Sequence, residues 1–435
     1  MPKIAVVGAG SHVFARRLVT DVLTWPSLRD STIALMDINE AALAPMAALA
    51  RRMVKQAGTS ATIEATTDLE EALQGADYVS VSIRVGDSDN HVTIPLKYGI
   101  DQAVGDTAGP GGVFYFLKNA PAVIEIARAM QRVCPDALML NYTNPMVMLS
   151  WAVKELAPVR YVGLCHSVQG TAMHLAEYIG APFDEVAYWV AGINHMAWFL
   201  EYRWKGQDAY PLIRKAMEDP AIYGRDIVKW EVMKHFGAFV SESSIHMSEY
   251  VPYFRRTPEL IDQHTSEAMW GVGTKGETRA QRAARFAESR RAQDEEMEQL
   301  ARGSAPIAIE RSHEYFARIL NACETNVPYV FNGNVPNTGL ISNLVQNGVV
   351  EVPILVDGCG LHPCHVGDLP PALAALNRGS LNLQELAVKG FIEQDREAIY
   401  RAIQLDPLTA SKLSLAEIRC MVDEMFAADG AYLSF

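Results

Sequence analysis

The first 165 residues alternate short apolar runs with amphipathic segments, and this alternation limits the possible folds more than any other feature. Each apolar run ends in a glycine, a polar residue or a turn residue. Strands that alternate with helices join through crossovers and form a parallel, doubly wound sheet, whose ligands bind at the carboxyl ends of the strands. We expect strands at 4–7, 32–36, 78–83, 137–140 and 161–164, and helices at 11–24, 120–133 and from a capping pattern at 67–70 to Gly75.

The residues beyond about 170 follow a less regular pattern. A strand is expected at 188–193, and helices are expected at 225–240 and 276–302. A chain of 435 residues is long for a single hydrophobic core. We therefore predict an α/β protein with an N-terminal, Rossmann-like doubly wound sheet at 1–190, which binds NAD. A mixed α+β domain for substrate binding and oligomer contacts follows at 191–435.

The charge balance and the cysteine content narrow the classes of partner. The formal net charge is −13, so neither nucleic acid nor an anionic membrane surface is an expected partner. The N-terminus lacks the long apolar region of a secretory signal, and no run of about 18 apolar residues follows. The 6 cysteines do not make a disulfide framework in a chain of this length. These features predict a soluble, cytoplasmic protein.

The turn after the first expected strand is typical of a dinucleotide site. Gly8-Ala-Gly10-Ser11 joins this strand to a helix, and its glycines let the backbone turn tightly and approach a pyrophosphate. Val13 replaces the third glycine of the usual fingerprint. The second strand ends at Asp37, where a carboxylate would bind ribose hydroxyls and repel a 2′-phosphate. The pattern predicts NAD rather than NADP; the alternative is an ordinary tight turn with a surface Asp.

Cys165 and His195 each follow an expected strand. Cys165 comes directly after the apolar run at 161–164, and His195 lies past Gly192 in the stretch AGINHMAWF. A thiolate and an imidazole could hold one divalent ion and leave positions open for substrate oxygens, as a catalytic site requires. A nucleophilic pair of Cys165 with His166 is a competing hypothesis, although adjacent strand residues point to opposite faces. An inert buried thiol and a packed core histidine are the plain structural alternative.

Asn144 lies in NYTNP, residues 141–145, at the end of another expected strand. The residue before a proline is pushed towards extended geometry, which could present the Asn144 amide to a cofactor or a sugar. The alternative is an ordinary loop asparagine.

Several motifs together resemble family 4 glycoside hydrolases. They are GAGS at 8–11, LMD at 35–37, GDTAGPGG at 105–112, NYTNPM at 141–146, GLCHSVQGT at 163–171 and AGINHMA at 191–197. The similarity continues through ESSIHMSEYVPYF at 242–254 to VEVP at 350–353, and so covers nearly the whole chain. Within the family, the residues CHS resemble those of melibiase-type α-galactosidases.

The resemblance implies an NAD- and Mn²⁺-dependent glycosidase that cleaves terminal α-D-galactosides by a redox route. NAD⁺ would take hydride from sugar C3, Mn²⁺ would act as a Lewis acid, a base would remove the C2 proton, and the aglycone would leave from C1. Water would then add back and NADH would reduce C3 again. A small-molecule α-galactoside would be the substrate, and the chain would form a homodimer or homotetramer.

The resemblance also implies roles for individual residues. Cys165 and His195 would bind the metal, Tyr250 would be the C2 base, His166 would occupy the position of a proton donor, Asn144 would contact sugar and cofactor, and Asp106 would bind sugar hydroxyls. Other functions stay open. They are an α-glucosidase or α-uronidase of the same family, an NAD-dependent hydroxyacid dehydrogenase, which would accumulate NADH, and a non-catalytic NAD sensor.

Overall fold

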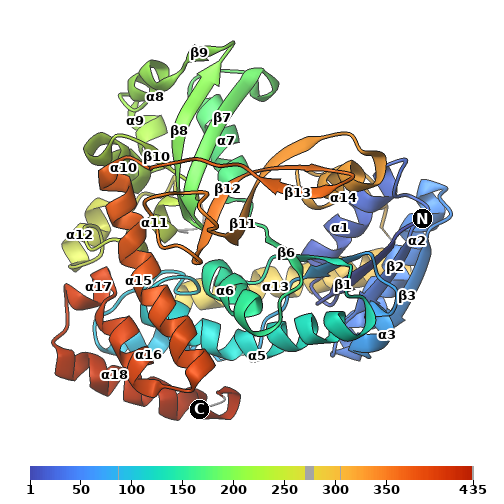
Figure 1. Cartoon of the computed structure of the whole chain (residues 1–435), viewed down its shortest axis with the longest axis horizontal. Helices are drawn as coiled ribbons and strands as arrows, with labels where there is room; N and C mark the ends of the chain where they lie inside the picture. Colours follow the sequence, from blue (N-terminus) through green and yellow to red (C-terminus); the bar gives the residue numbers. More distant parts are fainter. Residues whose placement is uncertain (87, 270–278, 304, 434–435) are drawn as a thin grey trace.

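One sheet runs through both halves of the chain. The computed structural model describes residues 1–86, 88–269, 279–303 and 305–433, and its strands join into a 13-stranded sheet (Figure 1). The path is β10-β8-β7-β12-β11-β6-β5-β4-β1-β2-β3, with β13 beside β12 and β9 beside β8. The strands are β1 Lys3–Val7, β2 Thr32–Met36, β3 Thr62–Thr66, β4 Tyr78–Val81, β5 Leu138–Asn141, β6 Arg160–Gly163, β7 Val186–Ile193, β8 Met196–Trp204, β9 Gln207–Asp208, β10 Phe239–Val240, β11 Tyr329–Pro336, β12 Val349–Asp357 and β13 Gly360–Pro363.

The segment of the sheet from β3 to β6 has the parallel order predicted from the sequence. Its strands pair in parallel in the order β3-β2-β1-β4-β5-β6, and the order reverses between β1 and β4, where Rossmann sheets bind dinucleotides. The predicted fold class is confirmed. β4 ends at Val81 rather than at residue 83, because the Ile83 amide donates to the Thr143 hydroxyl instead of a neighbouring strand. The mostly exposed edge strand β3 was not predicted.

The other segment of the sheet is antiparallel. β6 pairs with β11, and β12, β7 and β8 continue the sheet from there. The strand predicted at 188–193 is β7, but two strands from the C-terminal half of the chain separate it from β6. β7 and β8 form a hairpin whose two-residue turn is Asn194-His195. Residues beyond 190 therefore extend a sheet that the N-terminal residues begin.

The helices differ from the predicted ones mainly at their ends. The helix predicted at 120–133 already begins at Gly109, because side chains at Gly111 and Gly112 would lie 2.4 Å from backbone atoms and glycines here permit close packing. The helix predicted at 225–240 ends at Phe236, since Gly237 adopts a φ of 93°. Of the helix predicted at 276–302, residues 276–278 lie outside the described residues. The α-helices are α1 His12–Thr24, α2 Glu40–Ala57, α3 Leu69–Leu73, α4 Asn90–Lys97, α5 Gly109–Val133, α6 Met146–Leu156, α7 Ser167–Tyr178, α8 Tyr210–Ala216, α9 Pro220–Tyr223, α10 Ile227–Phe236, α11 Ser244–Tyr250, α12 Pro258–Gln263, α13 Arg279–Arg302, α14 Phe316–Thr325, α15 Pro371–Glu393, α16 Arg396–Gln404, α17 Pro407–Ala410 and α18 Leu415–Asp429.

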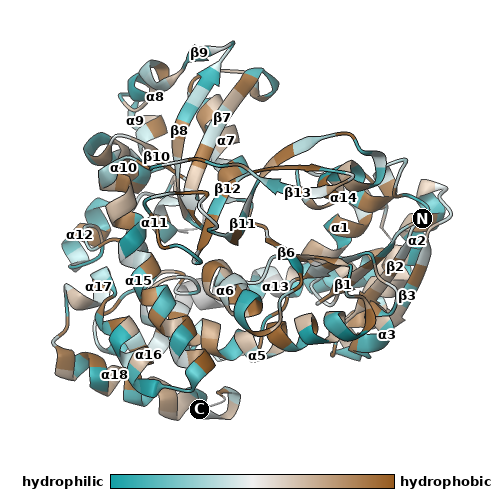
Figure 2. Cartoon of the chain, viewed as in Figure 1, coloured by the Kyte–Doolittle hydropathy of each residue, from teal (hydrophilic) through white to brown (hydrophobic). Residues whose placement is uncertain are grey.

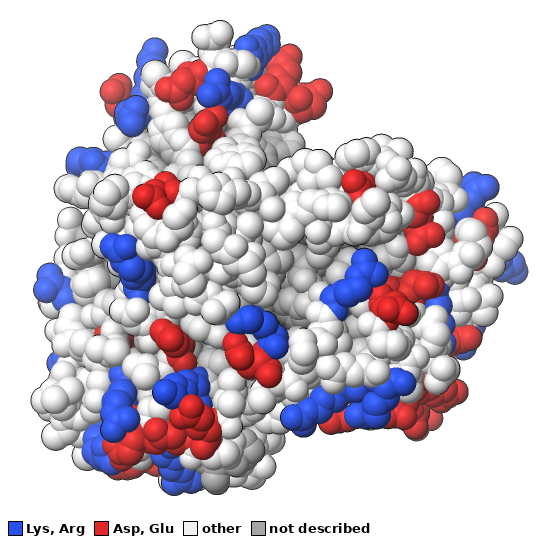
Figure 3. Space-filling view, viewed as in Figure 1, with Lys and Arg blue, Asp and Glu red and all other residues white. Residues whose placement is uncertain are grey.

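The C-terminal helices pack against α5 and α6, and α15 also contacts the sheet. In Figure 1, α15, α16 and α18 lie next to α5, and Figure 2 shows hydrophobic and hydrophilic residues alternating along α15 and α16, as expected of helices with one buried face. The buried Trp198 of β8 donates to Asn377 Oδ1 of α15 at 2.9 Å, which joins this layer to the sheet. On the face drawn in Figure 3, basic and acidic side chains are interspersed. None of the helices in the described ranges is both long and apolar enough to cross a bilayer.

Candidate active site

The turn between β1 and α1 has the geometry of a dinucleotide site. Gly8 has a φ of 91°, and a Cβ there would lie 2.0 Å from the backbone oxygen of Ser82. The Gly10 amide donates to Asp37 Oδ2 at 2.8 Å, so the carboxylate at the end of β2 lies against the turn. Ser11 is the N-cap of α1, and its side chain makes no capping hydrogen bond. Tight glycines, a helix N-terminus and one carboxylate fit a dinucleotide such as NAD.

Three potential metal ligands converge beyond the carboxyl end of β6. Cys165 Sγ lies 3.3 Å from His195 Nε2, and Glu242 Oε2 lies 3.7 Å from the same nitrogen. We call Cys165, His195 and Glu242 the trio. Their potential ligand atoms all lie within 4.8 Å of one another. Cys165 follows β6, His195 lies in the β7–β8 turn, and Glu242 precedes α11. The fold thus brings together the Cys165 and His195 side chains predicted from the sequence, although β11 and β12 separate the strands that carry them.

Two members of the trio have unusual backbone conformations. His195 has a φ of 63° and Glu242 a φ of 70°, a left-handed region that residues other than glycine seldom adopt. Such conformations cost about 1–3 kcal/mol each and cluster at functional sites, where the surrounding structure enforces them. At His195 the enforcing structure is the hairpin, which pairs Ile193 directly with Met196. The strain therefore coincides with the residues that converge here.

The ionisation of the trio suits a cation. Burial lowers the pKa of His195 although the Glu242 carboxylate opposes this shift, and an imidazole binds a metal in its neutral form. Burial raises the pKa of the Cys165 thiol, and the negative charge of Glu242 raises it further. A cation would oppose this shift because it favours the thiolate. Burial would also raise the pKa of Glu242, but the His195 and His246 imidazoles hold it well below its usual range. A thiolate, an imidazole and a carboxylate fit a divalent transition metal with positions left for substrate.

His246 links Glu242 to Asp106. Its Nδ1 lies 3.2 Å from Glu242 Oε1, and its Nε2 lies 3.5 Å from Asp106 Oδ1. Burial opposes protonation, but these two carboxylates raise the pKa of His246 well above its ordinary value. Burial would raise the pKa of Asp106 as well, and His246 lowers it instead. The result is an imidazolium between two carboxylates, and Asp106 keeps 27% of its side chain exposed for a hydroxyl donor.

Tyr250 lies at the end of the short helix α11, which also contains His246. Its side chain is buried, and its hydroxyl lies 3.5 Å from the backbone oxygen of Asn194, the residue before His195. Burial raises the pKa of the Tyr250 phenol, so positive charge near the trio is needed to favour its anionic form. Tyr250 therefore lies beside the trio.

His166 and Cys165 face different partners. His166 Nδ1 lies 2.9 Å from Glu314 Oε2, and Arg17 Nη1 lies 2.9 Å from Glu314 Oε1. The His166 ring stacks on Tyr142, with 5.9 Å between the ring centroids. Burial opposes protonation, but Glu314 raises the pKa of His166. The two neighbours lie in the loop between β6 and α7 rather than in a strand, so the loop, and not strand alternation, keeps them from pairing.

Asn144 lies just beyond the carboxyl end of β5. Its side chain is half-buried and makes no hydrogen bond to another residue of the described ranges. Neighbouring residues fix the conformation of the loop. The side-chain amide of Asn141 donates to the Thr143 backbone oxygen at 3.1 Å, and the Thr143 hydroxyl accepts from the backbone amide of Ile83 at 3.0 Å. The Asn144 amide is thus available to a ligand at this edge of the sheet.

Comparison with known proteins identifies the family. Residues 3–181 match the description "Family 4 glycosyl hydrolase", and residues 190–409 match "Family 4 glycosyl hydrolase C-terminal domain". The chain belongs to glycosyl hydrolase family 4. The resemblance stated from the sequence motifs is confirmed.

Relatives of this family 4 enzyme align with it over nearly its whole length. An alpha-galactosidase from Bacillus subtilis (strain 168) is 39% identical over 100% of this chain and 99% of its own. An alpha-galactosidase from Rhizobium meliloti (strain 1021) is 36% identical over 99% of this chain and 89% of its own. The fold is similar to that of a solved 6-phospho-alpha-glucosidase from gut microorganisms in complex with NAD and Mn²⁺, with a TM-score of 0.83, 20% identity and 99% of each chain covered.

The family 4 site also contains acidic residues and a histidine that were not singled out in the sequence. Glu242 and His246 lie eight and four residues before Tyr250, which was predicted from the sequence, and this regular spacing could have revealed them. Glu351 is a carboxyl group in the apolar run of β12; it is fully buried, and burial, followed by Cys165, raises its pKa well above the ordinary value. Glu314 has no local signal, because only the tertiary structure places it against His166.

Proposed function

We propose that this family 4 glycosyl hydrolase cleaves terminal α-D-galactosides, such as melibiose, with NAD and Mn²⁺ as cofactors. The observation that carries the proposal is the convergence of Cys165, His195 and Glu242 beyond the strands of a dinucleotide-binding sheet. Both relatives described above are named alpha-galactosidases, and the structural neighbour is in complex with NAD and Mn²⁺. The residues that would hold NAD are Gly8, Gly10, Ser11, Asp37 and Asn144, and those that would hold the metal are Cys165, His195 and Glu242.

Glu242 makes the trio more suitable for Mn²⁺ than the thiol and imidazole alone. Mn²⁺ prefers hard oxygen ligands, and a thiolate by itself is an unusual match for it. The Glu242 carboxylate, kept anionic by His195 and His246, supplies such an oxygen.

The proposed reaction assigns positioning and proton transfer to side chains around the trio. When bound, NAD⁺ and Mn²⁺ supply a hydride acceptor for sugar C3 and a Lewis acid for the sugar oxygens. With C3 oxidised, the C2 proton would be acidic, and Tyr250, beside the trio, would remove it. Asp106 accepts a hydrogen bond from a sugar hydroxyl, and Asn144 donates one from its amide.

His166 is the proposed proton donor to the leaving group. Its Nδ1 is held by Glu314, which raises the pKa of the imidazole and so favours the protonated form at neutral pH. With Nδ1 engaged, Nε2 is the nitrogen that can deliver a proton to the glycosidic oxygen as the bond to C1 breaks. The Arg17–Glu314 ion pair fixes the carboxylate and hence the ring orientation.

The same proposal extends to location and assembly. A cytoplasmic site of action suits the trio, because oxidation of Cys165 would remove a metal ligand and a reducing compartment prevents it. The cysteines of the described residues form no disulfide bonds, in agreement with such a compartment.

A homodimer or homotetramer is the proposed assembly, with the chain after residue 190 as its contact region.

Release of nitrophenol from nitrophenyl α-D-galactoside and from nitrophenyl α-D-glucoside tests this function. Each substrate is assayed with and without NAD⁺, Mn²⁺ and a thiol reductant, while NADH is followed by its absorbance. We expect galactoside cleavage that needs all three additives and accumulates no NADH. Cleavage of only the glucoside, or of only a uronide offered in parallel, would overturn the sugar specificity. NADH formation from a hydroxyacid without glycoside cleavage would replace the proposal with a dehydrogenase.

A further inference from the structure

Glu242 lies in the short link between β10 and α11, and both ends of this link are anchored. On one side, the Ser241 amide donates to the Ala197 backbone oxygen of β8 at 2.8 Å, and the Ser241 hydroxyl accepts from the Ala197 amide at 3.1 Å. On the other side, Ser243 is the N-cap of α11, and its hydroxyl accepts from the His246 amide at 3.3 Å. Between these anchors the backbone of Glu242 is left-handed, so its orientation depends on the groups that bind its backbone oxygen.

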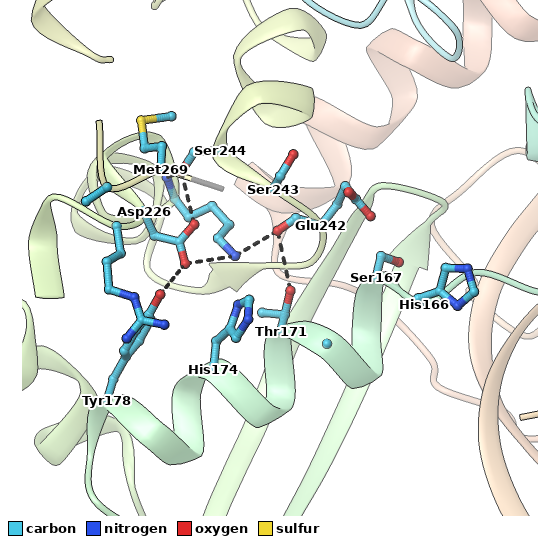
Figure 4. Close-up of a pocket in the computed structure, with 14 residues that line it drawn as sticks. His166, Ser167, Thr171, His174, Tyr178, Asp226, Glu242, Ser243, Ser244 and Met269 are labelled. Atoms are coloured by element: carbon cyan, nitrogen blue, oxygen red, sulfur yellow. Dashed lines mark hydrogen bonds and ion pairs between the residues drawn. The ribbon is translucent and has the colours of Figure 1, made fainter. Parts of the chain in front are cut away.

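A buried ammonium group binds the backbone oxygen of Glu242. Lys229 Nζ of α10 donates to this oxygen at 2.7 Å, and the Thr171 hydroxyl of α7 donates to it at 3.4 Å. Figure 4 shows both interactions as dashed lines that reach the backbone oxygen from one side, while the Glu242 carboxylate points away from them. The two hydrogen bonds therefore hold Glu242 from the side opposite to its carboxylate, the group that belongs to the trio.

Lys229 is itself fixed by other side chains. Its Nζ lies 3.1 Å from Asp226 Oδ2 and 5.0 Å from the centroid of the Phe239 ring. The Tyr178 hydroxyl donates to Asp226 Oδ2 at 2.7 Å, and the Ser244 hydroxyl donates to Asp226 Oδ1 at 3.3 Å. Only 1% of the Lys229 side chain is exposed. A buried ion pair is often no more stabilising than apolar residues of similar volume, so stability alone is a weak explanation for this one.

We propose that Lys229 is a positioning residue of the metal site: it binds the backbone oxygen of Glu242 and so keeps the link in the conformation that directs the carboxylate into the trio. The inference rests on the proposed function, in which Glu242 is a metal ligand, and it names the structure that enforces the strained backbone of this residue. Without Lys229 the carboxylate samples other orientations, and metal binding has to order it, which weakens the binding.

Calorimetric titration of Mn²⁺ into the NAD-saturated enzyme tests this role without turnover. Lys229→Met alone would leave the buried Asp226 carboxylate without its cation, so the test variant combines Lys229→Met with Asp226→Asn, which keeps an acceptor for the Tyr178 hydroxyl. We expect Mn²⁺ to bind about 10-fold more weakly, as for other groups that orient metal ligands, and the NAD affinity to stay near that of wild type.

The chain offers a matched control in a second buried ion pair. Lys118 Nζ lies 3.6 Å from Asp429 Oδ2, and the two side chains are 1% and 0% exposed. Lys118→Met with Asp429→Asn therefore makes the same chemical change away from the trio, and should leave the Mn²⁺ affinity unchanged. An equal loss of Mn²⁺ affinity in both double variants would overturn the positioning role.

The Glu242→Ala background shows whether Lys229 acts through Glu242. In this background, Lys229→Met with Asp226→Asn should cause no further loss of Mn²⁺ affinity. The same 10-fold loss there, or no loss in the otherwise wild-type chain, would overturn the proposal even if the enzyme cleaves α-galactosides. If wild type cleaves no glycoside, the proposed function fails, while the role of Lys229 is still decided by Mn²⁺ affinity. A wild-type enzyme that binds no Mn²⁺, or an unchanged Mn²⁺ affinity in Glu242→Ala alone, would overturn the metal assignment and the role of Lys229 together.

Discussion

The Glu242→Gln substitution removes one negative charge from the trio and keeps the size of the side chain. Glu242 Oε2 lies 3.7 Å from His195 Nε2, so the charge would lie about 4 Å or less from an ion held by that imidazole. Two unit charges about 4 Å apart interact by about 4 kcal/mol at an effective dielectric constant of about 20, and a divalent ion doubles this interaction. The amide oxygen can still coordinate, and it recovers part of the loss. We expect Mn²⁺ to bind about 10²- to 10³-fold more weakly, or by about 3–4 kcal/mol.

Calorimetric titration of Mn²⁺ into the NAD-saturated enzyme measures this loss. Glu351→Gln is the matched control, because Glu351 is a fully buried carboxyl near the trio but not a member of it, and burial raises its pKa well above the ordinary value. We expect the control to change Mn²⁺ affinity by about tenfold at most, the lower end of the effect of groups that surround metal ligands. Equal Mn²⁺ affinity in wild type and Glu242→Gln would refute the assignment of Glu242 as a metal ligand. An equal loss in both variants would show that the effect is not specific to the trio.

Three further substitutions test other parts of the molecule. Cys165→Ser should abolish metal-dependent turnover and leave the NAD affinity near that of wild type; retained turnover would contradict the metal assignment. Asp37→Ala removes the acceptor of the Gly10 amide and of the ribose hydroxyls, and should weaken NAD binding about 10-fold in a fluorescence titration, whereas unchanged binding would count against this site. Burial raises the pKa of Asp406 to about 6, so the folded state binds the proton more tightly than the unfolded state and loses stability as pH rises through that value. Asp406→Asn keeps an acceptor for the Thr409 backbone amide and cannot titrate. Its free energy of unfolding relative to wild type, measured by urea denaturation, should rise by about 1–1.5 kcal/mol from pH 5 to pH 8. A difference that stays the same across this pH range would contradict the shift.

The local sequence pattern was sufficient to predict the strands and the turn that form the proposed dinucleotide site. The tight turn at Gly8 and Gly10 and the carboxylate at Asp37 lie at the ends of consecutive parallel strands, whose order follows from the βαβ alternation. Helix ends were less predictable. The glycines at 109–112 suggest a loop, yet they begin α5, because close packing against the backbone of residues 105–107 requires residues without side chains.

The sequence alone determined the family, the parallel half of the sheet, the tight turn proposed to bind NAD, and the candidacy of Cys165 and His195. Only the tertiary structure decided which side chains complete the site. Glu242 joins the trio and Glu314 reaches His166 because distant segments pack there, and β11 and β12 enter the sheet between β6 and β7. Periodicity reports which face of a segment is buried, whereas pairing between segments far apart in the chain depends on how those faces fit together in three dimensions.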